Sequence, residues 1–222
     1  RVFYSRESVV MATVANRRSL MVLYSDSVSP IGHAVRIVLA EKDVNVEINY
    51  IDEGDVRPDE LNELNPYNST LTLIDRDLVL YDADIIMEYL DERFPHPPLM
   101  PVDPVNRGRN RQLRNRVMRD LYSAVNDIES DNDIAAANAK KVLRDHLTSI
   151  APAFSQMPYF MSEEYSLIDC CVGPLMWRLD QYGIKLPMSV KPLMEYAERI
   201  FEREAFKTSL SPAEKEFKEE SL

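Results

Sequence analysis

A proline-dense segment at residues 94–104 divides this chain into two parts with different hydrophobic periods. The segment reads FPHPPLMPVDP and holds five prolines. Because proline fixes φ and lacks a backbone donor, neither a helix nor a central strand continues through such a segment. Short apolar runs alternate with helical patterns before it, whereas only helical patterns follow it. The sequence therefore predicts an α/β unit followed by an all-α unit.

The first part has the pattern of a small α/β domain. The continuous apolar run LMVLY is typical of a buried strand, and the polar turn after it leads into apolar residues at helical spacing. Strict alternation at Val46, Ile48 and Tyr50 predicts a half-buried strand. Strands are expected at 20–24, 46–50, 71–74 and 78–81, and helices from 31, at 58–64 and at 82–94. This order predicts a thioredoxin-like domain.

The second part predicts four long helices. Ser166 and Asp169 have the spacing of a capping box, in which each side chain accepts a hydrogen bond from the other residue's backbone amide. The helices are expected at 105–128, 134–150, 167–182 and 189–203. The whole chain is then divided into a flexible extension at 1–18, a thioredoxin-like domain at 19–97, a proline-rich linker at 98–104, an all-helical domain at 105–210 and a charged, solvated tail at 211–222.

Charge and composition exclude several classes of protein. Acidic residues outnumber basic ones by 37 to 26, and the formal net charge is −11. Binding of bare nucleic acid needs an excess of Lys and Arg, so we expect no direct sequence-specific contact with DNA or RNA. No apolar run reaches the length of about 18 residues that indicates a membrane helix, and the first residues lack the apolar core of a secretory signal, so we expect a cytoplasmic protein with no membrane contact.

The cysteines and histidines predict neither a metal site nor a cofactor. Cys170 and Cys171 are adjacent, a placement that disfavours a structural disulfide. No Cys/His cluster has the spacing of metal ligands. We therefore expect two reduced, buried thiols and no cofactor.

Three stretches resemble known proteins. LYSDSVSPIGHAVRIVLAEK at 23–42 is similar to the first strand, active-site turn and first helix of the glutathione transferase superfamily. IMEYLDERFPHPPLMP at 86–101, with the block from 165 to 179, resembles one branch of it, the stringent starvation protein A family. The resemblance covers Met11 to about Phe217. It implies a homodimer that associates with RNA polymerase and its principal sigma factor and alters promoter use under starvation or acid stress.

The segment Phe94, Pro95, His96, Pro97 and Pro98 has two interpretations. On composition alone it is a linker that stops one helix and turns the chain into the second part. The resemblance instead implies that this surface contacts RNA polymerase holoenzyme. Stiff, proline-fixed loops suit that role because they lose little entropy when a partner binds them.

The positions that bind glutathione in the superfamily are altered in this chain. Ser29 stands where a catalytic hydroxyl or thiol would begin the first helix, although a Ser before Pro is more often a simple N-cap. Thr70 and Leu71 align with the segment that carries the family's cis-proline, and a cis bond without proline costs about 2.5–4 kcal/mol, so a trans bond is expected. Asp82 and Ala83 replace a Glu-Ser pair. The resemblance therefore implies a vestigial pocket and no transferase activity.

Six arginines and no acid lie between residues 107 and 119. Helical spacing puts Arg107, Arg111 and Arg114 on one side of a helix. One interpretation pairs them with acids of a neighbouring helix or subunit. The other has them dock on an acidic polymerase surface or on nearby DNA phosphate.

Two further functions stay open from the sequence. An active glutathione transferase or peroxidase would use Ser29. A scaffold that forms heterodimers through the same fold is the third possibility.

Overall fold

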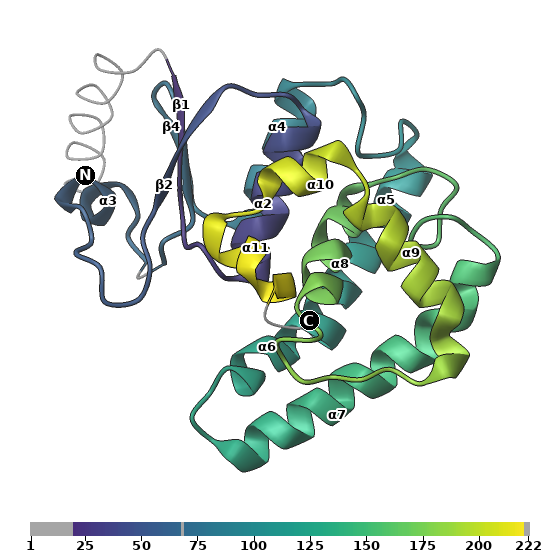
Figure 1. Ribbon diagram of the computed structural model, residues 1–222. Helices are drawn as coiled ribbons and strands as arrows, with labels where there is room; N and C mark the ends of the chain where they lie inside the picture. The colour runs from purple at the N-terminus through teal and green to yellow at the C-terminus, as the bar shows by residue number, and fades with distance from the viewer. Residues whose placement is uncertain (1–19, 68, 220–222) are drawn as a thin grey trace.

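The computed structural model describes residues 20–67 and 69–219 (Figure 1). The first part contains β1 (Met21–Ser25), α2 (Pro30–Glu41), β2 (Val46–Tyr50), α3 (Asp59–Leu64), β3 (Thr72–Asp75), β4 (Leu78–Leu80) and α4 (Ala83–Arg93). The second contains α5 (Pro104–Val117), a π-helical turn (Met118–Tyr122), α6 (Ser123–Ile128), α7 (Asp133–Ile150), a 3₁₀ turn (Ala151–Ser155), α8 (Leu167–Trp177), a 3₁₀ turn (Met188–Val190), α9 (Lys191–Phe201), α10 (Glu204–Ser209) and α11 (Pro212–Glu219).

The four strands form one mixed sheet in the order β2-β1-β3-β4. β1 pairs in parallel with β2 and antiparallel with β3, and β3 and β4 form the expected antiparallel hairpin. Every residue of β1 is buried, because helices cover both faces of the sheet at this strand. α3 lies on the outer face, while α2 and α4 lie between the sheet and the helical part (Figure 1). The predicted α/β plus all-α class is confirmed.

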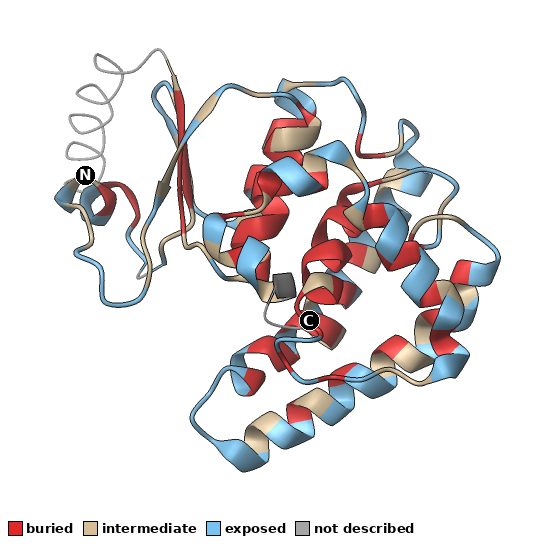
Figure 2. Ribbon diagram, in the orientation of Figure 1, coloured by how far each residue is buried: buried red, intermediate tan, exposed pale blue. Residues whose placement is uncertain are grey.

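One continuous apolar core joins the two parts of the molecule. Leu23 of β1 and Val38 of α2 belong to the same cluster of buried residues as Leu143 of α7 and Leu175 of α8. A smaller cluster, which includes Val22 and Leu61, fills the space under α3. Figure 2 shows that α2 and α8 are buried along most of their length. The arrangement of the two parts is therefore set by shared apolar burial as well as by the linker.

The helical part differs from the sequence prediction in three places. The helix expected at 105–128 is interrupted by the π-helical turn at Met118–Tyr122. The helix expected at 167–182 ends at Trp177, and Gly183, with φ of +66°, closes the turns that follow. Residues 204–209 form α10, for which no helix was expected.

The C-terminal tail is the largest correction. We expected residues 211–222 to be solvated, but Pro212–Glu219 forms α11 and the side chains of Ser211 and Glu214 are completely buried. The charged residues of this segment are typical of a solvated helix, and the sequence does not show that one of them, Glu214, faces the core. The N-terminal extension expected at 1–18 lies outside the described residues.

Candidate functional site

Residues Phe94–Pro98 form an exposed arch between α4 and the helical part, here called the proline arch. Pro95, His96, Pro97 and Pro98 are all exposed, and the half-buried Phe94 ring lies 5.1 Å from the Arg93 guanidinium. Phe94 ends α4, its amide donating to the Leu90 carbonyl at 3.0 Å. The chain then turns inward, because Leu99 and Met100 are buried in the core. The arch is thus a raised surface that is fixed at both ends.

A buried ion pair holds the proline arch from below. Lys42 Nζ donates to Asp91 Oδ1 at 2.7 Å and also to the Pro97 carbonyl. The same Asp91 oxygen accepts from the Leu99 amide at 2.8 Å. The Leu99 carbonyl in turn accepts from the amide of Leu167, the first residue of α8, at 2.9 Å. One pair of charges therefore fixes the position of the arch relative to α2, α4 and α8.

Sequence reasoning did not single out Lys42 or Asp91. The available signal was the position of Asp91, which lies on the same face of α4 as the buried residues Met87 and Leu90. A charged residue on an apolar stripe needs a partner, since burying an unpaired charge is costly. That partner comes from the end of α2.

The arginine face, formed by Arg107, Arg111 and Arg114 on α5, is paired within the molecule. Arg111 Nε lies 2.9 Å from Glu88 Oε1, and Arg107 Nη2 lies 3.6 Å from Glu92 Oε1. The acids belong to α4, so the arginines tie the helical part to the thioredoxin-like part. This is the arrangement of the first interpretation, pairing with a neighbouring helix.

Arg114 is not available for docking. Its side chain is 3% exposed, its Nε donates to Asp84 Oδ1 at 2.9 Å, and its Nη2 donates to Glu88. Burial would raise the pKa of Glu88, but the hydrogen bonds from Arg111 and Arg114 outweigh that effect and lower it. Arg111, which is 46% exposed, and Arg107 are the members of the face that solvent reaches.

Ser29 is the N-cap of α2. Its Oγ accepts from the Gly32 amide at 3.1 Å and donates to Asp26 Oδ2 at 2.6 Å. The hydroxyl proton is thus directed at a carboxylate, which opposes its use as a donor to a thiolate. A side chain at Gly32 would crowd this turn, because its Cβ would lie 2.6 Å from Ser25 Oγ.

The altered glutathione positions come together at one end of the sheet, where β1 and β4 end and β3 begins. Thr72 pairs with Tyr24 near the end of β1, which brings Thr70 and Leu71 toward the loop that leads to Ser29. Asp82 follows β4 and caps α4, accepting from the amides of Asp84 at 3.0 Å and Ile85 at 3.3 Å, with Ala83 as the first helical residue. Among the described residues the cis peptide bond is His96–Pro97, so the bond before Leu71 is trans, as expected.

The C-terminal helix packs against the loop before Ser29. Ser211 Oγ donates to the Ser27 carbonyl at 2.6 Å, and the Arg178 guanidinium donates to the Val28 carbonyl at 2.9 and 2.8 Å. Glu214, which is fully buried, accepts from Arg36 Nη2 at 2.7 Å and also from Arg178. His33 adjoins this cluster, and burial, followed by the two arginine charges, lowers its pKa.

The two thiols fit the predicted inert role. Cys170 and Cys171 are free and buried. Burial raises the pKa of Cys171 to about 12, which keeps the thiol protonated at neutral pH. No group of His, Cys, Asp and Glu within the described ranges could hold a metal ion, and no helix there is long and apolar enough to cross a membrane.

Comparison with known proteins decides the family. Residues 23–98 match the family model described as glutathione S-transferase, N-terminal domain. The chain is 51% identical over 201 residues to a stringent starvation protein A homolog of Pasteurella multocida, covering 90% of this chain and 94% of that protein. This chain belongs to the stringent starvation protein A family. A homolog from Coxiella burnetii is 46% identical over 204 residues, covering 91% of this chain and 97% of that protein.

Solved structures show the glutathione transferase fold for this family member. A glutathione transferase from Methylococcus capsulatus superposes with a TM-score of 0.78 at 22% identity, covering 88% of this chain and 99% of that one. Ure2p in complex with glutathione superposes with a TM-score of 0.75 at 15% identity, covering 90% and 97%. At these identities the likeness shows the fold alone. The family assignment and the fold expected from residues 23–42 and 86–101 are both confirmed.

Proposed function

We propose that this stringent starvation protein A family member binds RNA polymerase holoenzyme, including its principal sigma factor, through the proline arch in the cytoplasm. Bound there, it would alter promoter use under starvation or acid stress without itself reading DNA sequence. The observation that carries the proposal is an exposed arch of Pro95, His96, Pro97 and Pro98 held rigidly by the buried Lys42–Asp91 pair. The family membership supports the choice of partner.

The physical argument rests on preorganisation. A flexible loop must be ordered on binding, which costs about 0.5–1.5 kcal/mol for each immobilised side chain. The proline arch carries three prolines and is anchored by a charge pair, so little of that cost remains. Exposed rings beside a histidine that donates or accepts hydrogen bonds suit a protein surface with both apolar and polar groups.

We propose further that the protein acts without glutathione chemistry. The Ser29 hydroxyl is committed to Asp26, and the Asp82 carboxylate already caps the N-terminus of α4. In this chain the carboxylate therefore fills the place where a helix N-terminus would receive an anionic ligand group. Both features support a protein that does not use glutathione.

Binding of purified RNA polymerase holoenzyme to the immobilised full-length protein tests the arch. His96→Ala combined with Pro97→Ala is expected to reduce affinity at least about tenfold, since it removes the centre of the surface. His146→Ala with Pro152→Ala, the same residue types in the helical part, serves as the matched control and should leave affinity unchanged. Equal affinity for wild type and the arch variant would contradict the assignment.

We also propose that the protein is a homodimer that pairs through the groove between α4 and α5. This groove is open, and its wall includes Ile85, Leu78 and the paired side chains of Glu88 and Arg111. Ile85 is exposed although it belongs to an apolar helix pattern. A surface with both apolar groups and both signs of charge complements itself across a two-fold axis. Ile85→Glu should yield monomers by light scattering, and a persistent dimer would refute this interface.

A further inference from the structure

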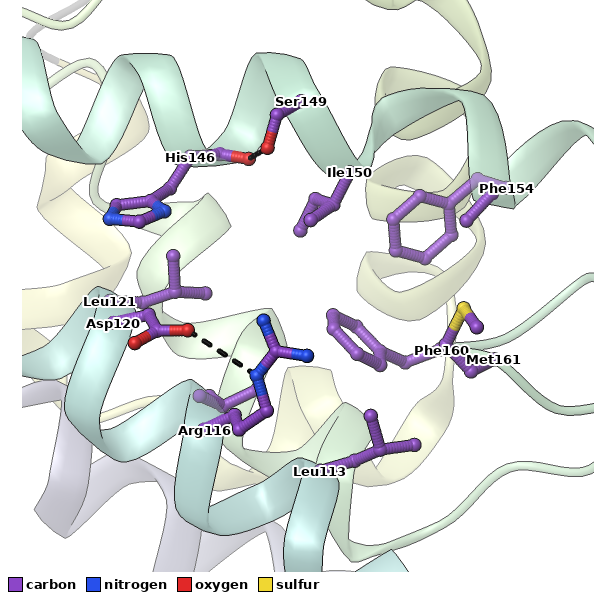
Figure 3. Close-up of a pocket in the computed structure, with 12 residues that line it drawn as sticks. Leu113, Arg116, Asp120, Leu121, His146, Ser149, Ile150, Phe154, Phe160 and Met161 are labelled. Carbon is purple, nitrogen blue, oxygen red and sulfur yellow. Dashed lines mark hydrogen bonds and ion pairs between the residues drawn. The ribbon is translucent and has the colours of Figure 1, made fainter. Parts of the chain in front are cut away.

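A cavity of about 300 Å³ opens in the helical part, between α5, the π-helical turn and the C-terminal end of α7 (Figure 3). No residue of the proline arch, the arginine face or the Ser29 loop lines it. The volume falls at the lower end of the range for small-molecule sites, roughly 300–1,000 Å³. A dry cavity of about 150 Å³ holds a benzene-sized molecule, so this one has room for a ring or short chain together with a polar group.

One end of the cavity is apolar and aromatic. The rings of Phe154 and Phe160 meet edge to face with centroids 5.6 Å apart, and both residues are buried. Figure 3 shows Ile150, Leu113 and Met161 around these rings. Met161 is 53% exposed, so an apolar body seated here would remove its side chain from water.

The other end is polar. Arg116, Asp120 and His146 gather there, on α5, the π-helical turn and α7 respectively (Figure 3). The Arg116 side chain is 68% exposed, and its Nε lies 3.6 Å from Asp120 Oδ2. The terminal nitrogens of Arg116 point away from Asp120 toward the open space of the cavity (Figure 3). The two terminal nitrogens of Arg116 therefore face the cavity between Asp120 and the phenylalanines.

We propose that this cavity binds a small organic acid with an apolar body, its ring or chain packed on Phe154 and Phe160 and its carboxylate paired with the terminal nitrogens of Arg116. Guanidinium donors match a carboxylate in a two-point arrangement, which is stronger than a bond to a neutral acceptor. Asp120 holds the Nε side of Arg116 and so aims its terminal nitrogens. His146, on the opposite wall, adds a further hydrogen-bonding group near the same end of the cavity.

Titration calorimetry of the purified full-length protein with 4-phenylbutanoate tests the site, and 4-phenylbutanamide is the neutral control. For a ligand of this size a dissociation constant up to about 1 mM is expected. Arg116→Gln should weaken binding of the acid by about tenfold or more and leave the weaker binding of the amide unchanged. Arg119→Gln removes an exposed arginine of the same segment that does not line the cavity, and should bind the acid like wild type.

A filling variant separates this cavity from other surfaces. Ala153→Leu projects a larger side chain from the cavity wall and should abolish binding of both probes. Thermal melts establish whether each variant is folded. If Ala153→Leu does not fold, the comparison of Arg116→Gln with wild type tests the proposal by itself. Absence of saturable binding of the acid to wild type would overturn the proposal. It would also be overturned if wild type and Arg116→Gln each bound the acid and the amide with equal affinity. Neither result depends on RNA polymerase.

Discussion

Lys42 at the end of α2 and Asp91 in the last turns of α4 form a buried ion pair of 2.7 Å directly beneath the proline arch. Both partners also bond to the backbone of the segment they support, Lys42 to the Pro97 carbonyl and Asp91 to the Leu99 amide. The pair therefore determines where the exposed prolines stand, although neither side chain is itself exposed.

Breaking this pair should weaken both the fold and partner binding. Asp91→Asn leaves Lys42 buried without its counter-charge, and removing one partner of a buried pair costs about 3–5 kcal/mol. We expect a loss of that size in the free energy of unfolding, measured with urea, and weaker polymerase binding under conditions where the variant is folded. Lys42→Met combined with Asp91→Leu removes both charges and should recover most of the stability but not the affinity. Full affinity of the folded Asp91→Asn variant would show that the arch does not need its anchor.

Glu214 should contribute far more to stability than its sequence context indicates. Its carboxylate accepts from Arg36, Arg178 and the Ser211 amide, and it is fully buried. Glu214→Ala is expected to lower the free energy of unfolding by about 3–5 kcal/mol, because two buried guanidinium groups lose their counter-ion. Glu216→Ala, an exposed change on the same helix, is the control and should have an effect within about 0.5 kcal/mol. Similar effects of the two changes would mean that α11 is not docked in solution.

Asp169 should make the fold relatively more stable in acid. Burial raises the pKa of this carboxyl from 3.8 to about 6, despite hydrogen bonds from the Phe160 and Ser166 amides and the Tyr196 hydroxyl. The folded state then binds more protons than the unfolded state between about pH 4 and 6, so the contribution of Asp169 to stability falls as pH rises through that window. A shift of this size corresponds to about 3 kcal/mol.

The pH dependence is measured by urea unfolding at intervals from pH 4 to 7, with Asp169→Asn as the comparison. The unfolding free energy of wild type minus that of the variant should fall as pH rises, and become constant above about pH 7. A difference that grows with pH over this range would have the wrong sign and would refute the raised pKa.

Ser29 should prove to be a cap and nothing more. Ser29→Ala removes the acceptor of the Gly32 amide and is expected to lower the free energy of unfolding by about 1 kcal/mol. Polymerase binding should not change, and neither protein should be retained on immobilised glutathione. Retention of wild type, with turnover of a thiol-reactive substrate that Ser29→Ala abolishes, would instead establish a transferase.

Much of the fold was predictable because its signals are local. The caps at Asp82 and Ser166 lie within three residues of the amides that they bind, and the strand and helix periods repeat within single elements. Prolines 95–104 mark the boundary between the two parts through their own φ restriction. The N-cap role of Ser29 follows from the same kind of local feature.

The partners of charged side chains were not predictable, because they are distant in sequence. Lys42 and Asp91 are 49 residues apart, and Arg36 and Glu214 are 178 apart. The sequence shows that Arg111 and Arg114 share a helix face, but only the packing of α5 on α4 places Glu88 against them.

The sequence by itself therefore determined the strands and helices of the first part, the division at the proline-dense segment and the family to which the chain belongs. The tertiary structure decided which charges are buried, that residues 212–219 pack as a helix against the loop before Ser29, and that a buried ion pair anchors the proline arch. Local backbone preferences act over a few residues, whereas burial and charge pairing depend on the final arrangement of the whole chain.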